Sequence, residues 1–214
     1  MRRLRLTWGG ATDQGRIRAN NQDAMYADSA LFVVADGMGG HQGGEVAANL
    51  AVRTVANADR SNREQLRDAI IEANRVVHET ALEEPELHGM GTTLTALAVS
   101  QEADSHQFVI LNVGDSRVYR HRDGELEQLT EDHSYVAELV RRGELDNQAA
   151  EVHPYRNMLT RAIGVHADVE VDEWLLEPVA GDRFMLCSDG LTNELADTEI
   201  AEQLGLGQDP STSA

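Results

Sequence analysis

Four aspartates occupy positions where carboxylates could gather at one end of a fold. Asp23 lies in a predicted turn, NNQDA, whereas Asp36, Asp115 and Asp189 each follow an apolar run that predicts a strand (LFVVA, VILNVG and RFMLCS). Loops at strand ends hold side chains on a rigid frame. Taken singly, each of these acids is most simply a turn former or a helix cap. The set of four is what suggests a site.

Carboxylates gathered in this way need cations. Two of them ~4 Å apart repel by roughly 4 kcal/mol at an effective dielectric constant of 20, so a cluster persists only where protons or cations neutralise it. The chain has no lysine, and few of its 18 basic residues, all arginine, lie near these aspartates. A bound divalent ion would neutralise such a cluster. Donor sets made only of oxygen favour Mg²⁺ or Mn²⁺ over zinc.

The stretch VADGMGGHQGGEVAA (34–48) places five glycines in positions 37–44, between a predicted strand and a predicted helix. Glycine lets the backbone approach a ligand closely. Asp36 could therefore supply a carboxylate that bridges two ions, and Gly37 could supply a backbone oxygen. A phosphate-cradling P-loop is the competing interpretation, but it requires the sequence GK[ST], which is absent.

Length and composition exclude several classes of protein. A chain of 214 residues forms one ordinary domain or at most two small ones. The net charge of −19 argues against nucleic acid as the main partner. A plain acidic surface accounts for most of the carboxylates. No apolar run is as long as a membrane span, and the basic start lacks the apolar segment of a signal peptide. The single cysteine, Cys187, is expected in a buried strand. We expect a cytoplasmic protein.

The hydrophobic pattern predicts strands in adjacent groups and helices in pairs, which favours antiparallel sheets covered by helices over a parallel sheet. Asp123-Gly124, within RVYRHRDGELEQL, predicts a hairpin with a two-residue turn. The tail GQDPSTSA has the composition of a linker. Strands are expected at 3–8, 31–35, 92–99, 107–113, 168–174 and 182–187, and helices at 44–58, 62–83, 134–142 and 194–204.

Seven segments in this order make the sequence similar to the metal-dependent serine/threonine protein phosphatases, the protein phosphatase 2C (PPM) family, in its bacterial form. One such segment alone would be weak evidence, but seven in the family's order and spacing form a very specific match. They are TDQGRIRANNQDA (12–24), VADGMGG (34–40), MGTTLTAL (90–97), NVGDSRVYR (112–120), LTEDHSYVAELVRRG (129–143), LTRAIG (159–164) and GDRFMLCSDGLT (181–192).

The resemblance implies an α+β fold, a four-layer α-β-β-α sandwich of two antiparallel sheets flanked by helices. It also implies hydrolysis of phosphoserine and phosphothreonine in proteins by water that a binuclear Mn²⁺ or Mg²⁺ centre activates, with a third, looser ion. The implied partners are phosphorylated proteins, namely the substrates of a bacterial Ser/Thr kinase and the kinase itself.

The same resemblance assigns roles to individual residues. Asp36 would bridge both ions, Gly37 would give its carbonyl to one ion, and Asp189 would hold the other. Asp23 would belong to the metal centre by orienting metal-bound water, and Asp115 would match the aspartate of the third ion. The remaining catalytic residue is Arg18, of RIRANNQD, which would grip the substrate phosphate.

The sequence also departs from the family pattern. Met38 stands where many eukaryotic members have a histidine proposed as general acid. Gln22 and Asn193 replace acids found in other members, which should weaken metal binding without abolishing it. Family domains end with a further strand pair that carries a metal-binding aspartate, so we expect residues 1–206 to form a C-terminally incomplete catalytic domain and 207–214 a tail. The alternative is an inactive or weakly active phosphatase-like module that binds phosphoproteins or regulates a partner.

Overall fold

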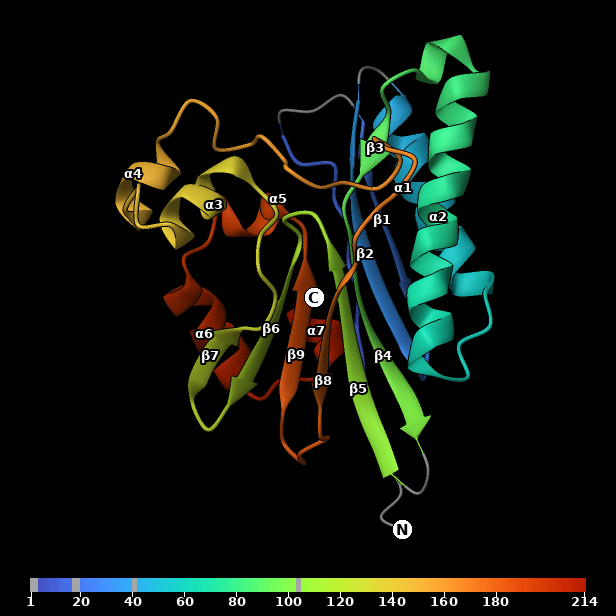
Figure 1. Cartoon of the computed structure of the whole chain (residues 1–214). Coiled ribbons are helices and arrows are strands. Elements are labelled where there is room, and N and C mark those ends of the chain that lie inside the picture. The colour runs from blue at the N-terminus through green and yellow to red at the C-terminus, as the bar shows by residue number, and fades with distance from the viewer. Residues whose placement is uncertain (1–3, 17–19, 40–41, 103–104) are drawn as a thin grey trace.

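The computed structural model describes residues 4–16, 20–39, 42–102 and 105–214, and it contains two antiparallel sheets that face each other (Figure 1). The larger sheet has the order β1-β2-β4-β5-β8, with the short β3 beside β2, and the smaller sheet has the order β7-β6-β9. The strands are β1 (Asp23–Ala27), β2 (Leu31–Met38), β3 (Gly91–Thr92), β4 (Leu94–Glu102), β5 (Ser105–Val113), β6 (Arg117–Arg122), β7 (Glu125–Gln128), β8 (Asp172–Leu176) and β9 (Arg183–Cys187).

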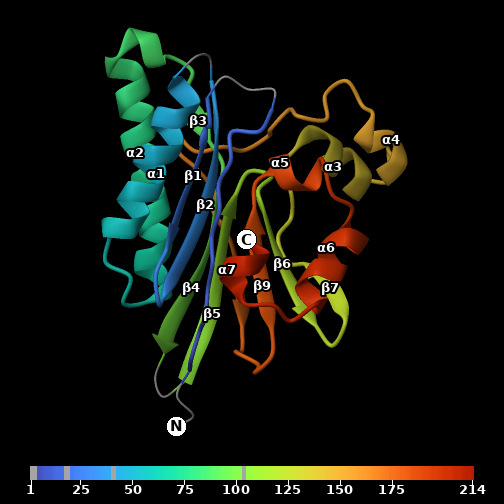
Figure 2. The ribbon, with the colours of Figure 1, turned by 180° about the vertical axis from the view of Figure 1, so that it is seen from behind.

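Helices cover the outer faces of both sheets, so the expected four-layer α-β-β-α sandwich is confirmed. The helices α1 (Gly43–Asn57) and α2 (Arg63–Glu83) lie side by side on the larger sheet, and α6 (Asp197–Gly205) packs on β6 and β7 of the smaller one (Figure 2). The remaining helices are short: η1 (Pro85–Leu87), α3 (Tyr135–Arg141), α4 (Asn147–Glu151), α5 (Asp189–Thr192) and α7 (Pro210–Ser213).

Two hydrophobic layers hold the sandwich together. Between the helices and the larger sheet, Leu31 and Val33 of β2 pack with residues of α2 such as Ile70. Between the two sheets, Phe108 meets Phe184 edge to face, with ring centroids 5.2 Å apart. Each buried side chain of this size stabilises the fold by about 1.5–3 kcal/mol. Because β2 alternates strictly between these layers, Asp36 lies on the same face as Phe32, the face that looks toward the smaller sheet.

The predicted strand at 3–8 is wrong for the part that the structure describes, because residues 4–10 belong to neither sheet. Leu4 and Leu6 nevertheless pack against the layer between the sheets, so the alternation in the sequence is real. An alternating pattern indicates which side chains are buried, but it does not indicate whether a neighbouring strand is available for pairing. The tail also differs from a linker: a Cβ on Gly9 would lie 2.4 Å from the carbonyl oxygen of Pro210, so the short helix α7 packs on the N-terminal segment.

The other predicted elements are confirmed with shifted ends. Helix α1 is shifted by one residue at both ends, and α2 begins one residue later than predicted. Asn62 caps α2 by accepting a hydrogen bond from the Gln65 N–H. Asp123 and Gly124 have φ values of 53° and 88°, the pair of left-handed residues that a primed hairpin turn requires. The strand expected at 168–174 lies at Asp172–Leu176. No helix in the described part of the chain is long and apolar enough to cross a membrane.

Candidate active site

Asp23 and Asp36 lie directly opposite each other on the antiparallel strands β1 and β2. Such a pair places the two side chains on the same face of the sheet, with Cβ atoms about 4.5–5.5 Å apart. Both residues are partly buried, at the rim where the two sheets meet. The sequence predicted Asp36 after its strand, and the structure corrects this, because β2 continues through Gly37 to Met38. The two carboxylates are therefore held side by side by a sheet rather than by loops.

The backbone of Asp36 is fixed by a cluster of hydroxyl groups. Its N–H donates to Oγ1 of Thr93 at 2.9 Å, and its carbonyl oxygen accepts from the Thr93 N–H and from Oγ1 of Thr92, both also at 2.9 Å. Oγ1 of Thr93 also lies 2.7 Å from Oγ of Ser116, the residue that follows Asp115. These contacts fix the Asp36 backbone, and with it the direction in which the side chain leaves the strand.

The backbone around Gly37 is packed so closely that it leaves no room for a side chain. A Cβ at this position would lie 2.0 Å from the carbonyl oxygen of Gly44 and 2.7 Å from that of Gln22, and the Gly37 N–H donates to the same Gln22 oxygen at 3.1 Å. The strand, the start of α1 and the segment before β1 therefore meet at one point. This close approach explains why glycines stand at both ends of the stretch between β2 and α1.

Ser188 connects the smaller sheet to this pair of acids. Its Oγ donates a hydrogen bond of 2.7 Å to Oδ2 of Asp23. Ser188 is the residue before α5, and Asp189 is the first residue of that helix. The bond therefore brings the end of β9, and Asp189 with it, to the rim where Asp23 lies.

Asp115 is a partly buried carboxylate with other acids nearby. Burial, together with the negative charges of Asp189 and Asp132, raises its pKa to about 7, and Arg117 offsets this only in part. Arg117 is engaged elsewhere, since it donates to both carboxylate oxygens of Asp132 and to the hydroxyl of Tyr119. Asp115 and Asp189 thus form a second pair of neighbouring acids.

The loop that presents Asp115 is clamped by His133. Gly114 has a φ of 106°, donates its N–H to Nδ1 of His133 at 3.0 Å and accepts the His133 N–H at 3.0 Å. Nε2 of His133 lies 3.0 Å from Oδ2 of Asp172, close to Nη1 of Arg161. Burial lowers the pKa of His133, and because Nδ1 accepts from Gly114, Nε2 carries the proton. A neutral histidine of fixed tautomer thus positions the Asp115 loop.

These residues fit divalent ions in three respects. The donors are carboxylate and carbonyl oxygens, which Mg²⁺ and Mn²⁺ prefer. Gly37 brings backbone from three segments together beside Asp36, and the charge around Asp115 is poorly compensated. Among the described residues, no group of three or more His, Cys, Asp or Glu side chains is arranged to hold an ion as it stands. The acids instead form the pairs Asp23–Asp36 and Asp115–Asp189, and cations are what offset the repulsion within such pairs.

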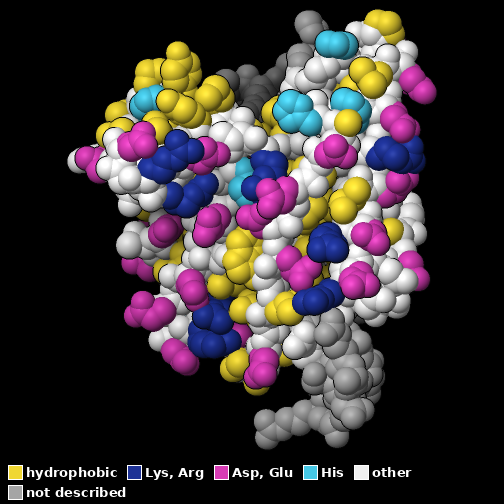
Figure 3. Space-filling model, in the orientation of Figure 1, with side chains coloured by type: hydrophobic (Ala, Val, Ile, Leu, Met, Phe, Trp, Pro, Cys, Tyr) yellow, Lys and Arg dark blue, Asp and Glu magenta, His cyan; other side chains and the backbone are white. Residues whose placement is uncertain are grey.

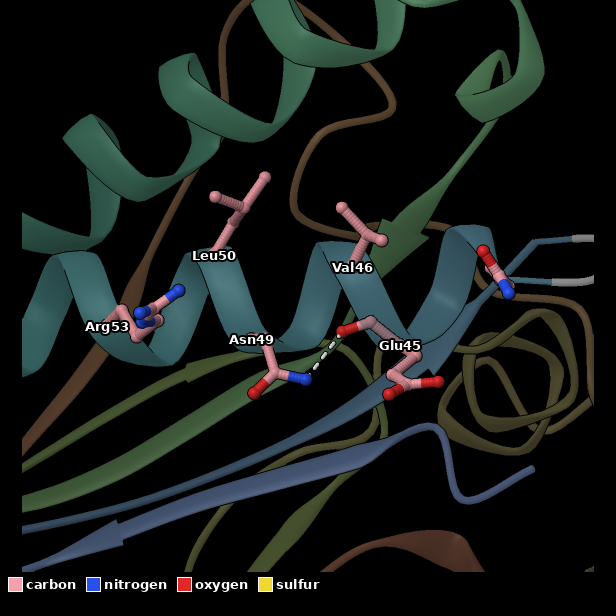
Figure 4. A pocket seen from close by; sticks show the side chains of 6 residues that line it. Glu45, Val46, Asn49, Leu50 and Arg53 are labelled. Atoms are coloured by element: carbon pink, nitrogen blue, oxygen red, sulfur yellow. Dashed lines mark hydrogen bonds between the residues drawn. The ribbon is translucent and has the colours of Figure 1, made fainter.

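A hollow of about 330 Å³ lies elsewhere, along the outer side of α1 (Figure 4). In it, the side-chain amide of Asn49 donates to the carbonyl oxygen of Glu45 at 2.8 Å. The lining offers one acid and one arginine rather than converging carboxylates, so we place the chemistry at the rim. The hollow is lined by Gln42, Glu45, Val46, Asn49, Leu50 and Arg53.

Acidic and arginine side chains are interspersed over the face shown in Figure 3, in agreement with a generally acidic surface.

The sequence profile of the Protein phosphatase 2C family matches residues 15–206, most of the chain. The chain belongs to this family. This phosphatase 2C match covers nearly all of the seven segments on which the resemblance was based, because only residues 12–14 of the first segment lie outside it.

Named relatives and solved structures agree with this assignment. The phosphatase 2C chain is similar to the serine/threonine phosphatase stp of Listeria monocytogenes, with 43% identity over 207 residues, covering 90% of this chain and 81% of that protein. It is 39% identical to the serine/threonine protein phosphatase PstP of Mycobacterium tuberculosis, covering 94% of this chain but only 39% of that longer protein. A structure of the PstP catalytic domain in complex with two manganese ions superposes with a TM-score of 0.84 at 38% identity, covering 95% of this chain and 86% of that one.

Of the residues that the resemblance assigned to the phosphatase 2C site, the structure places Asp23 opposite Asp36 and Asp115 near Asp189. Arg18 lies outside the described residues, so its phosphate contact stays a prediction. Sequence reasoning missed the residues that hold these acids in place, which are Thr93, Ser116, His133 and Ser188. Each of them lies in a segment that the sequence singled out. Ser116 and Ser188 stand directly beside Asp115 and Asp189, and that proximity was an available signal, whereas Thr93 has no acid beside it in the sequence.

Proposed function

We propose that this chain is a metal-dependent protein phosphatase that hydrolyses phosphoserine and phosphothreonine with Mn²⁺ or Mg²⁺ as cofactor. The observation that carries the proposal is the facing pair Asp23 and Asp36, beside the close backbone contact at Gly37. Membership of the phosphatase 2C family and the manganese-containing relative support it. The catalytic domain is proposed to span residues 1–206, with 207–214 as a tail.

The proposed metal ligands are oxygen donors from β2, from the loop after β5 and from the start of α5. Asp36 would contribute its carboxylate to two ions, the carbonyl of Gly37 would contribute to one of them and Asp189 to the other. Asp115 would hold a third ion more loosely. When bound, such ions lower the pKa of water from about 15.7 toward neutrality and offset the charge of the phosphoryl group.

Residues of the chain itself are proposed to orient the water and to bind the phosphate. Ser188 occupies one oxygen of Asp23, which leaves the other to accept a hydrogen bond from the attacking water and so orient it. Arg18 is proposed to bind the phosphate through its guanidinium, whose planar fork matches two phosphate oxygens. Burial raises the pKa of Cys187 to about 12, so its thiol stays protonated at neutral pH and serves as no nucleophile.

The proposed partners are phosphorylated proteins, including the substrates of a serine/threonine kinase and that kinase itself. The names of the relatives support this, since they are serine/threonine protein phosphatases. The proposed location is the cytoplasm.

The test is phosphate release from a phosphothreonine peptide. We expect turnover with Mn²⁺, none with EDTA, and a fall to background in Asp36→Asn, which keeps the size of the side chain but removes the charge that two ions share. Asp68→Asn is the matched control, because Asp68 is an exposed acid on α2. Turnover that survives EDTA, or Asp36→Asn with the activity of Asp68→Asn, would contradict the proposal.

A further inference from the structure

We propose that the hydroxyls of Thr93 and Ser116 form a buried link that fixes the position of Asp36 relative to Asp115 for metal binding. Both are positioning residues, since they touch the backbone or the neighbour of a proposed ligand and not the ligand's carboxylate. The inference rests on the proposed function, because it concerns the same ions.

The first half of the link joins Thr93 to Asp36. Oγ1 of Thr93 accepts the Asp36 N–H at 2.9 Å, and the Thr93 N–H donates to the Asp36 carbonyl oxygen at 2.9 Å. Thr93 therefore holds the peptide groups on both sides of the Asp36 Cα. Together these two bonds fix the direction in which the Asp36 side chain leaves β2.

The second half joins Thr93 to the loop after β5. Oγ1 of Thr93 lies 2.7 Å from Oγ of Ser116, and a Cβ on Gly114 would lie 2.6 Å from Cγ2 of Thr93. The hydroxyl and the methyl of one threonine thus contact the residues on either side of Asp115. Thr93 is 2% exposed and Ser116 is 0% exposed, so water does not compete for these contacts.

The link matters because Asp36 and Asp115 come from different parts of the larger sheet. Asp36 lies in β2, whereas Asp115 follows the end of β5, and β4 runs between those two strands. A hydrogen bond in a dry interior is costly to break, since a polar group that loses its partner finds no water in exchange. The relative position of the two acids is therefore fixed before any ion arrives.

The test measures Mn²⁺ affinity directly, by titration calorimetry on the metal-free full chain. Thr93→Val removes the hydroxyl but keeps the shape, and Ser116→Ala removes its partner. We expect each to weaken Mn²⁺ binding by roughly tenfold or more, the usual effect of removing a group that orients metal ligands. Thr93→Ser, which restores the hydroxyl, should recover most of the affinity.

The chain offers a matched control two residues away. Thr95 is also buried in β4, at 0% exposure, but its hydroxyl has no hydrogen-bond partner among the described residues. Thr95→Val should therefore bind Mn²⁺ as the wild type does. The double variant Thr93→Val/Ser116→Ala should lose little more affinity than Thr93→Val alone, because both changes break one link.

The inference is overturned if Thr93→Val binds Mn²⁺ like Thr95→Val, or if Thr93→Ser binds as weakly as Thr93→Val. Should Thr93→Val not fold, as judged by circular dichroism, Ser116→Ala decides: affinity near that of the wild type overturns the link, and a loss of tenfold supports it. A wild-type chain that binds no Mn²⁺ would overturn the proposed metal centre itself, and the link with it. Normal wild-type binding with unchanged variants overturns the link alone.

Discussion

The Ser188 hydroxyl donates a hydrogen bond of 2.7 Å to Asp23, although 165 residues separate the two in the sequence. Ser188 follows β9 of the smaller sheet, and Asp23 begins β1 at the edge of the larger one. The bond therefore joins the two sheets at the rim where the acids lie, and it fixes one oxygen of a carboxylate that is proposed to orient the attacking water.

Replacing Ser188 with alanine should affect stability and turnover together. Hydrogen bonds to charged groups contribute about 1.5–3 kcal/mol, and because both partners are only partly buried we expect a loss near the lower end, about 1.5 kcal/mol. Turnover should fall more than substrate affinity, since Asp23 loses its orientation. Urea unfolding and steady-state kinetics measure the two effects. Ser100→Ala is the control, because Ser100 is buried with no hydrogen-bond partner in the described part of the chain; equal behaviour of the two variants would refute the role of Ser188.

The two Asp-Gly pairs of the site should tolerate alanine very differently. A Cβ on Gly37 would lie 2.0 Å from the carbonyl oxygen of Gly44, a backbone atom that cannot move away alone, so Gly37→Ala should unfold the protein or cost several kcal/mol. The nearest atom to a Cβ on Gly190 is 3.7 Å away, and Gly190 lies in α5, where alanine is favoured over glycine by about 1 kcal/mol. Thermal melting of both variants tests this. A Gly37→Ala variant as stable as Gly190→Ala would contradict the close approach.

Arg18→Ala should raise KM for phosphate esters with a smaller change in kcat, because a group that binds the phosphate equally well before and during the reaction affects binding most. This prediction rests on the RIRANNQD segment. Arg16→Ala is the matched control, two positions earlier and exposed. Steady-state kinetics on p-nitrophenyl phosphate provide the measurement. An unchanged KM in Arg18→Ala would remove this residue from the phosphate site.

Much of this architecture could be predicted from local sequence patterns. The long helices follow from the apolar spacing of residues such as Leu66 and Ile70, and the hairpin follows from Asp123-Gly124, whose conformation needs only two residues to specify. The gathering of the four acids could be expected because strands of a sandwich end at common rims. The role of each acid came from the resemblance, and the structure supplies only their placement.

The rest depends on contacts between distant segments, which no local pattern encodes. The alternation of Leu4 and Leu6 predicts burial, but whether the segment pairs as a strand depends on a neighbour elsewhere in the chain. Thr93 and Ser116 are 23 positions apart in the sequence. Ser188 and Asp23 are 165 positions apart. Serine and threonine are common at turns for local reasons, so their presence in a motif gave no indication of these partners.

The pKa of Asp115 predicts an unusual pH dependence for the metal-free protein. Burial, with the neighbouring charge of Asp189, raises that pKa to about 7 in the folded state, against about 3.9 for an unfolded chain. Between these values the folded state binds more protons than the unfolded state, so the free energy of unfolding falls as the pH rises toward about 7 and levels off above it. The ionised carboxylate is therefore a source of instability at pH 8 and not at pH 4.

Asp115→Asn removes that source because the amide is neutral at every pH. We expect the metal-free variant to unfold like the wild type near pH 4 but to be more stable at pH 8, by roughly 2–4 kcal/mol, since each unit of pKa difference is worth about 1.4 kcal/mol. Urea unfolding in EDTA at both pH values measures the difference, with the exposed Asp68→Asn as control. Saturating Mn²⁺ should reverse the order at pH 8, because the cation stabilises the ionised wild-type side chain and not the amide. A variant that gains nothing at pH 8 in EDTA would show that Asp115 is already compensated in the folded protein, and it would remove the electrostatic reason for an ion at this position.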